Sequence, residues 1–339
     1  MRSWPQAAAL GRALTQLCGA EAAVIGRSTL HLFWDLFGLF DPRDWSVIVD
    51  EHSYPVARWA ASRMLDADAR LREFIHLDVD DLAQHCRQSK RKRVRPLILT
   101  DSFCCVCGNA PSLGAYCDLA RQYDGLVIMD DTQRLGLVGT GTTPTMPFGW
   151  GGGGSLPFHK LVREPIVAIS SLAKALGSPT AVAVGPADII ARLQRDGDSR
   201  VHCSQPSAAD MGSVAHALLL NKRCGDRKRA MLARGVEVFR TETERYGLQI
   251  VTSLHPTQSV YLRENQSTIE CHRRLKERGI ACLAGKGHRG EPRLVFLLTC
   301  RHLPQEIRQT IHVVADVTSA FRSDAVSMRR FSPAGTGSR

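Results

Sequence analysis

The sequence predicts an α/β fold with a mainly parallel sheet. In the first two thirds of the chain, short apolar runs alternate with segments whose apolar residues recur at helical spacing, which is the pattern of strands joined by crossover helices. The expected strands are 22–25, 46–49, 72–76, 96–100, 126–129, 166–170 and 181–184. The expected helices are 4–18, 30–40, 56–65, 79–88 and 113–123. The pattern therefore predicts a mostly parallel sheet of seven strands.

The pattern changes after about residue 186. Long, charged helical stretches are followed by short strands at 249–252, 259–262 and 293–298, with a helix at 267–278 between the last two. We expect four parts: a large α/β domain over 1–186, connecting helices over 187–245, a small C-terminal α+β domain over 246–321 and a disordered tail over 322–339. The glycine-rich segment 141–161 is expected to be a flexible loop.

The composition fits a folded protein without a membrane span. The chain has 339 residues, of which 44% are hydrophobic and 23% charged. Its most apolar stretch, 30–40, is much shorter than the roughly 20 residues that cross a bilayer. This stretch also contains Asp35, so we expect a buried helix. The N-terminus lacks the apolar core of a signal peptide, so we expect a cytoplasmic protein and no membrane partner.

Charge and cysteine content suggest two further kinds of partner. The net charge of +11 is compatible with nucleic-acid binding. The densest basic cluster, 90–95, has no interleaved aromatic residues, so we expect a solvated loop and no nucleic-acid partner. Eleven cysteines without an export signal indicate reduced thiols. Four of them, Cys104, Cys105, Cys107 and Cys117, cluster without a common zinc spacing, so we expect buried thiols and no metal.

Two charged residues follow neighbouring strands of the expected sheet. Lys174 lies among small residues just after the strand 166–170, where we expect poor solvation to make its amine a better nucleophile. Asp130 closes the strand 126–129 and is followed by Asp131; one aspartate is expected to face the cleft and the other to support the turn. An amine and a carboxylate so placed meet the needs of a pyridoxal 5'-phosphate (PLP) site.

Other side chains near strand ends are candidates for the same site. Ser28 and Thr29 open the helix 30–40, where hydroxyls and free amide groups suit a phosphate; a simple N-cap role is equally compatible. Ser171 offers a further phosphate contact. Tyr54 could stack on a pyridine ring, although a half-buried turn tyrosine is the commoner case.

The order of these motifs resembles the fold-type I PLP-dependent transferases, in particular the α-oxoamine synthase group of the class I/II aminotransferase superfamily. The stretch 171–178, Ser-Leu-Ala-Lys-Ala-Leu-Gly-Ser, is similar to the family's Schiff-base lysine motif. The other similar stretches are 19–25, 100–111 and 126–139. The resemblance spans most of the chain from about residue 10 and weakens after residue 181.

The resemblance implies roles for particular residues. Lys174 becomes the Schiff-base lysine and proton shuttle, and Asp130 the partner of the pyridine nitrogen. Ser28 and Thr29 fall in the phosphate loop, and Tyr54 stands where the family stacks a histidine. The remaining positions near the cofactor oxygen are Cys105, in place of a serine, and Gln133, in place of a histidine. Lys286, Arg289 and Arg293 are alternative ligands for the substrate carboxylate.

The resemblance also implies a reaction and an assembly. It implies an amino-acid substrate activated through an external aldimine and a Cα carbanion, then condensed with an acyl-coenzyme A thioester, in a cytoplasmic homodimer. An aminotransferase on the same fold would use the same residues. The chain begins late relative to the family, without its N-terminal arm, so a PLP-fold binding protein that has lost catalysis is a further alternative.

Overall fold

The computed structural model describes residues 5–65 and 71–319. Its larger sheet has seven strands in the order β1-β7-β6-β5-β4-β2-β3. The strands are β1 (Ala22–Gly26), β2 (Trp45–Asp50), β3 (Arg72–Phe74), β4 (Arg95–Asp101), β5 (Leu126–Asp130), β6 (Ile166–Ser171) and β7 (Ala181–Gly185). All neighbours from β3 to β6 pair in parallel, and β7 is antiparallel to both β6 and β1. The predicted seven-stranded, mostly parallel sheet is confirmed.

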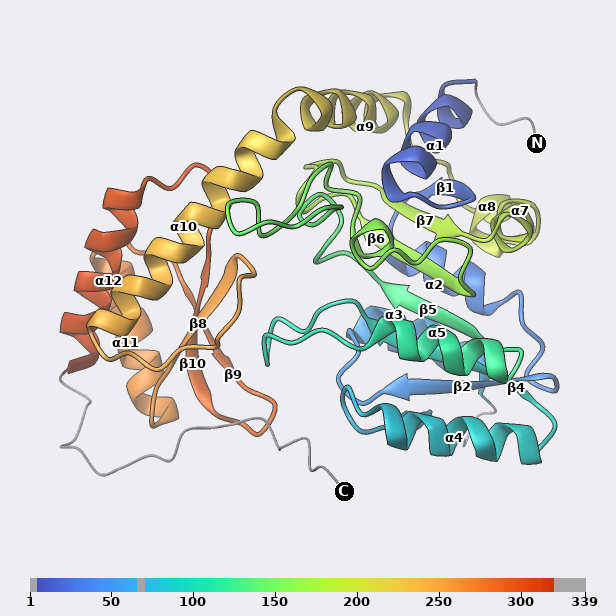
Figure 1. The fold of residues 1–339 in the computed structure, drawn as a ribbon, viewed down its shortest axis with the longest axis horizontal. Helices are drawn as coiled ribbons and strands as arrows, with labels where there is room; N and C mark the ends of the chain where they lie inside the picture. Colours follow the sequence, from blue (N-terminus) through green and yellow to red (C-terminus); the bar gives the residue numbers. More distant parts are fainter. Residues whose placement is uncertain (1–4, 66–70, 320–339) are drawn as a thin grey trace.

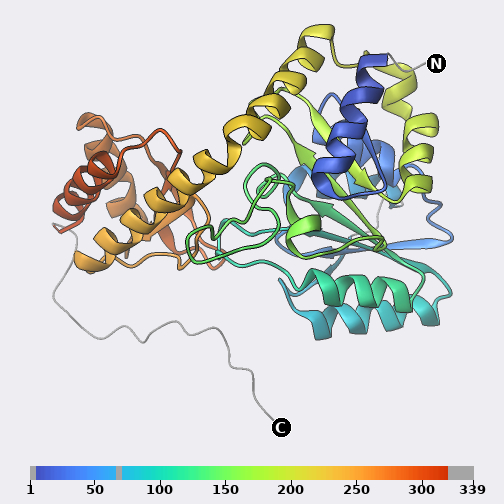
Figure 2. The same ribbon diagram turned by 45° about the horizontal axis from the view of Figure 1, so that its top comes forward.

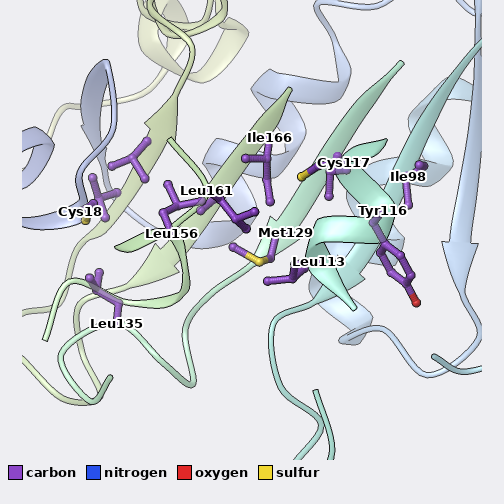
Figure 3. Close-up of a cluster of buried hydrophobic side chains, with 14 of the residues drawn as sticks. Cys18, Ile98, Leu113, Tyr116, Cys117, Met129, Leu135, Leu156, Leu161 and Ile166 are labelled. Atoms are coloured by element: carbon purple, nitrogen blue, oxygen red, sulfur yellow. The ribbon is translucent and has the colours of Figure 1, made fainter. Parts of the chain in front are cut away.

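Helices cover both faces of this sheet (Figure 1). They are α1 (Pro5–Cys18), α2 (Thr29–Phe37), α3 (Pro55–Ala61), α4 (Val79–Arg91), α5 (Leu113–Gln122), α6 (Ser155–Phe158), α7 (Ala187–Asp196) and α8 (Asp198–His202). Because successive strand residues point to opposite faces, Ile98 packs with α4 and α5 while Leu97 and Leu99 pack with α2 and α3. Figure 3 shows part of the first cluster, where side chains of α5 meet strand residues such as Met129.

A second, three-stranded antiparallel sheet lies beyond a long helical connection. Its order is β8-β10-β9, with β8 (Thr257–Tyr261), β9 (Leu283–Lys286) and β10 (Pro292–Leu297). The helices of this half are α9 (Ala208–Leu220), α10 (Asp226–Arg245), α11 (Asn265–Glu277) and α12 (Pro304–Ser319), with one π-helical turn between α9 and α10. Figure 2 shows α9 and α10 running from one sheet to the other. Phe239 of α10 joins residues of α11, α12 and both β8 and β10 in a separate apolar core.

Several sequence predictions for the second half need correction. The expected strand 249–252 is wrong, because only Ile250 forms an isolated bridge, with Val260. Both β9 and α12 are additional to the expected elements. The expected tail at 322–339 lies outside the described residues. The four-part division into domains stays a prediction, with the larger sheet contained in 22–185 and the smaller one in 257–297.

The segment 141–161 is a hydrogen-bonded loop rather than a loose one. The Gly136 amide donates to the Gly152 carbonyl at 2.8 Å, and the Gly154 amide donates to the Val138 carbonyl at 2.8 Å. A Cβ at Gly153 would lie 2.1 Å from the Leu17 carbonyl oxygen, which is closer than any real contact. The glycines therefore serve close packing against α1, which composition alone does not distinguish from flexibility.

No helix within residues 5–65 and 71–319 is long and apolar enough to cross a membrane.

The carboxyl ends of β2 and β5 point toward the three-stranded sheet (Figure 1). In an open parallel sheet, ligands bind at this edge. The fold therefore places the candidate residues between the two sheets.

Candidate functional site

Two carboxylates lie side by side at the carboxyl edge of the sheet. Asp101 ends β4 and Asp130 ends β5, and the two residues are direct partners in the parallel ladder. Asp130 is only 6% exposed, and its Oδ1 accepts a hydrogen bond from the Thr132 amide at 2.9 Å. Burial raises the pKa of Asp130, while hydrogen bonds from Thr132 and the charge of Lys174 lower it. Burial and the neighbouring Asp130 raise the pKa of Asp101 to about 8.

Lys174 lies in the turn between β6 and β7. The turn is closed by the Leu172 amide, which donates to the Thr180 carbonyl at 2.8 Å, and by the Ser178 amide, which donates to the Leu172 carbonyl at 3.1 Å. The Lys174 side chain is exposed, so the expectation of poor solvation is wrong for the chain alone. Its charge lowers the pKa of three buried or half-buried groups: Asp130, Cys105 and His255.

The consecutive residues Asp130 and Asp131 have different structural roles, as the sequence predicts. Asp131 is buried and accepts two hydrogen bonds from Ser155, one from its amide at 2.9 Å and one from its hydroxyl at 2.5 Å. It therefore anchors α6 and the glycine-rich loop. Thr132 links the two strand ends, because its hydroxyl accepts a hydrogen bond from the Ser171 amide at 3.0 Å. Ser171 in turn accepts from the Ala173 amide at 3.3 Å, one residue before Lys174.

Ser28 is the N-cap of α2. Its hydroxyl accepts from the His31 amide at 3.4 Å and lies 2.8 Å from His31 Nδ1. The backbone of Ser28 is extended, and Thr29 is the first residue of the helix. The strand that precedes them, β1, runs parallel to β6 because both are antiparallel to β7. The cap role is thus present, and the phosphate role stays a prediction.

Tyr54 reaches the same edge through its backbone. It is the N-cap of α3, and its amide donates to Asp101 Oδ1 at 3.1 Å. Its side chain is 52% exposed. The carboxylate of Asp101 therefore holds the backbone of Tyr54, which is predicted to stack on the cofactor. Asp101 is also the ladder partner of Asp130, which is predicted to bind the cofactor nitrogen.

A histidine absent from the sequence prediction completes the edge. His255 is 7% exposed and precedes β8. Its Nδ1 accepts from the Thr257 amide at 3.1 Å, and its Nε2 lies 3.1 Å from the Gln133 carbonyl. Cys105 Sγ lies 3.8 Å from the same Nδ1. Burial, with the charges of Arg134 and Lys174, lowers the pKa of His255 to about 4, so the imidazole is neutral near pH 7.

The three candidates for the substrate carboxylate differ in their surroundings. Lys286 and Arg289 are exposed on the β9–β10 hairpin. Arg293 is 6% exposed, and its Nη1 donates to the Val106 carbonyl at 2.8 Å and to the Ser259 hydroxyl at 3.3 Å. Arg293 therefore ties β10 to the loop that carries Cys105.

Asp101 and His255 are the site residues that sequence reasoning missed. A signal existed for Asp101, because it ends a strand next to the one that Asp130 ends. No local signal existed for His255, which meets Gln133 from 122 residues away in the chain.

Comparisons with known proteins give the family context. No family model matches the chain. An 8-amino-7-oxononanoate synthase of Alkalilimnicola ehrlichii is 26% identical over 321 residues, which span 92% of this chain and 77% of that relative. The enzyme of the same name from Xylella fastidiosa is 24% identical over 266 residues, or 78% of this chain. The chain spans 63% of the length of that second relative.

Solved structures show the same fold. A Sphingomonas wittichii serine palmitoyltransferase superposes with a TM-score of 0.79 at 16% identity, covering 94% of this chain and 77% of that one. The 8-amino-7-oxononanoate synthase of Francisella tularensis gives a TM-score of 0.75 at 16% identity, covering 94% and 88%. The chain has the fold-type I architecture and is a homologue of the α-oxoamine synthases. A serine palmitoyltransferase structure containing PLP matches with a TM-score of 0.81 at 13% identity, covering 94% and 78%.

The residues at the edge fit the cofactor of those homologues. A buried carboxylate with a raised pKa gains from a cationic partner, and a protonated pyridine nitrogen is such a partner. Asp130 supplies that carboxylate, and the charge of Lys174, in the turn after the neighbouring strand, lowers its pKa.

Proposed function

We propose that the chain is a PLP-dependent transferase that condenses an amino acid with an acyl-coenzyme A thioester. The observation that carries this proposal is the placement of Lys174 and buried Asp130 at the ends of neighbouring strands, close enough for the charge of one to shift the pKa of the other. The homology to α-oxoamine synthases supports the acyl-transfer reaction over other reactions on this fold.

Each candidate residue has a role in this proposal. Lys174 would hold the cofactor through its amine and would move the Cα proton of the substrate, and Asp130 would hold the pyridine nitrogen. PLP supplies the electron sink that makes the Cα proton removable. Ser28, Thr29 and Ser171 would hold its phosphate. Tyr54 would stack on its ring, while Cys105 and Gln133 would lie near its phenolic oxygen.

Lys286 and Arg289 are the accessible candidates for the substrate carboxylate. Both are exposed, whereas the guanidinium of Arg293 is already hydrogen-bonded to backbone and hydroxyl oxygens. An exposed cation is free to bind a carboxylate, so we place the substrate nearer to the β9–β10 hairpin than to the buried Arg293.

We also propose that two copies of the chain form a homodimer. Large apolar side chains are exposed together on α2 and α3: Leu30 is 41%, Trp34 42% and Trp59 63% exposed. They line a surface cavity of about 440 Å³ with residues of α8. Because monomers rarely expose such clusters, this face suits a second copy. Light scattering on the purified chain measures the assembly directly.

Absorbance and reductive trapping test the cofactor. The reconstituted chain should show a band at about 400–430 nm, as expected for a Schiff base of PLP. Borohydride should fix the cofactor covalently to the wild type but not to Lys174→Ala. Lys228→Ala, which alters an exposed lysine of α10, is the matched control and should trap the cofactor normally. A colourless chain that cannot be reconstituted contradicts the proposal.

Product analysis then separates the two reactions. Amino acids are tested individually with and without acyl-coenzyme A. Release of coenzyme A supports the condensation. Formation of a keto acid with a pyridoxamine spectrum indicates an aminotransferase, and PLP binding without turnover of any substrate indicates a protein that has lost catalysis.

A further inference from the structure

A second group of reactive side chains lies at the same edge but outside the proposed cofactor site. It consists of His76, Cys104, Cys107 and His288, here called the Cys/His cluster. One nitrogen or sulfur atom from each residue lies within 4.8 Å of the corresponding atoms of the other three. His288 Nε2 is 3.1 Å from Cys104 Sγ, and His76 Nε2 is 3.4 Å from Cys107 Sγ. The cluster shares no residue with the set assigned to PLP.

The four residues come from three separate segments. His76 follows β3, and both cysteines lie in the loop after β4, where the Gly108 amide donates to the Cys104 carbonyl at 2.8 Å. His288 is at the tip of the β9–β10 hairpin, which is closed by the Gly287 amide donating to the Glu291 carbonyl at 2.7 Å. The cluster therefore connects the larger sheet to the smaller one.

Neighbouring groups fix both imidazoles. Asp50 Oδ1 lies 2.7 Å from His76 Nδ1, which directs Nε2 toward the cysteines. The Asp50 carboxylate also accepts from the amides of His52 at 2.9 Å and Leu77 at 3.1 Å. His288 stacks face to face on His52, with ring centroids 3.6 Å apart and planes 3° apart. A carboxylate that orients a histidine in this way is the usual support of a metal ligand.

The chemistry of the four donors selects the class of ion. Two sulfurs with two imidazole nitrogens form a set typical of tetrahedral zinc, with zinc–sulfur distances of about 2.3 Å and zinc–nitrogen distances of about 2.0–2.1 Å. In a regular tetrahedron such bonds place the donors about 3.3–3.8 Å apart. The two sulfur–nitrogen distances of 3.1 Å and 3.4 Å lie near this range, and no two of the four donor atoms are more than 4.8 Å apart. Small side-chain rotations would therefore bring all four donors to zinc-binding distances.

We propose that the Cys/His cluster binds one zinc ion as a closed structural site that ties the three-stranded sheet to the seven-stranded sheet. Four protein ligands leave no position for a substrate or water, which is the mark of a structural rather than a catalytic zinc. The site also holds the loop on either side of Cys105, which faces His255 and Lys174. The sequence expectation of no metal rested on the spacing of the cysteines alone. The structure adds His76 and His288, which are distant in the sequence, and for this reason we propose a metal site.

Metal analysis of the full chain tests the proposal. Wild-type protein purified without chelator is expected to contain one zinc ion per chain. Cys104→Ser and Cys107→Ser should lose it, whereas Cys300→Ser, which removes a thiol outside the cluster, should retain it. Cobalt exchanged into the wild type should show the visible bands of a tetrahedral thiolate complex. A wild type that contains no zinc and does not take up added zinc overturns the proposal.

Two further variants keep the test decisive if a cysteine variant fails to fold. His288→Ala changes only a hairpin tip and should weaken zinc binding while leaving the circular dichroism spectrum unchanged. Asp50→Asn should weaken zinc binding about 10–100-fold through the orientation of His76. Lys174→Ala should bind zinc like the wild type, which separates this proposal from the proposed function. Mass spectrometry that finds a Cys104–Cys107 disulfide and no metal in freshly purified protein overturns the proposal.

Discussion

Two groups of polar side chains share the carboxyl edge of the larger sheet, and they differ in how their charges are balanced. In the proposed cofactor site, the carboxylates of Asp101 and Asp130 are adjacent and both have raised pKa values. The charge of the exposed Lys174 lowers the pKa of Asp130, and the charge of His76 lowers the pKa of Asp101. In the Cys/His cluster, donors already pair with one another and with Asp50. The carboxylates of the proposed cofactor site therefore keep raised pKa values, whereas the members of the Cys/His cluster have hydrogen-bonding partners in one another and in Asp50.

This difference indicates what each group binds. Buried carboxylates with raised pKa values are stabilised when a ligand supplies a cation or hydrogen bonds, and we propose that a pyridinium nitrogen is this cation for Asp130. Soft donors that converge on one point need only a single ion at their centre. Changes to one group should therefore leave ligand binding by the other intact.

The largest effect is expected at Lys174. Replacing Lys174 with Ala removes the group that moves the Cα proton, so turnover should fall by about 10²–10⁴-fold or more. Coenzyme A release under saturating amino acid measures the rate. The zinc content should remain that of the wild type, because Lys174 is exposed and is not one of the four cluster residues. Full turnover in this variant would exclude the proposed mechanism.

Zinc removal should have the next largest effect, on stability. An ion present at 1,000 times its dissociation constant stabilises the folded chain by about 4 kcal/mol. A strong chelator should therefore lower the melting temperature by several degrees, as followed by circular dichroism. Cys107→Ser should melt at the lower temperature with or without chelator. An unchanged melting temperature in chelated wild type would indicate that the two sheets hold together without the ion.

A smaller, pH-dependent effect is expected at His255. Its folded pKa of about 4 is below the unfolded value near 6.5, so the unfolded chain binds the proton more readily. The associated stability is complete above pH 6.5 and is lost as the pH falls toward 4, by up to about 3 kcal/mol. Urea unfolding at several pH values measures it.

In His255→Gln, the free energy of unfolding should fall less between pH 6.5 and pH 4 than it does in the wild type. Another part should persist, because burial and Arg134 also lower the pKa of His159 to about 4. His159→Gln is the matched control, and the double variant should be flatter than either single one. Identical pH profiles in the wild type and His255→Gln would show that His255 is not held neutral.

The sequence indicates that the residues of the proposed cofactor site lie at one edge of the sheet, but it does not indicate that the residues of the Cys/His cluster meet. The reason is physical. Asp130 ends one apolar strand and Lys174 lies in the turn after the next, and buried parallel strands place their carboxyl ends at one edge. Tyr54 and Ser28 follow the same rule. The Cys/His cluster depends on His288, which is 184 residues from Cys104 and lies on a hairpin. A single histidine in a polar stretch gives no signal of its partners.

The smaller sheet was harder to predict because its strands lack the buried pattern. β9 has mostly exposed residues, so no alternation of apolar and polar side chains marks it. The stretch 249–252 has apolar residues but forms only one bridge, because the chain turns away toward Ser253 and His255. Edge strands and single bridges depend on tertiary contacts that are set far away in the chain.

The smallest effect is expected at Arg293, which contacts the loop between the two groups. Arg293→Lys keeps the charge but loses the fork that reaches the Val106 carbonyl and the Ser259 hydroxyl. Unfolding free energy should fall by about 1–2 kcal/mol, with KM for the amino acid little changed. Lys286→Ala is the contrasting variant, expected to raise KM without altering stability. If Arg293→Lys instead raises KM strongly at unchanged stability, then Arg293 binds the substrate carboxylate, and the loop that links the cofactor edge to the Cys/His cluster is held by other contacts.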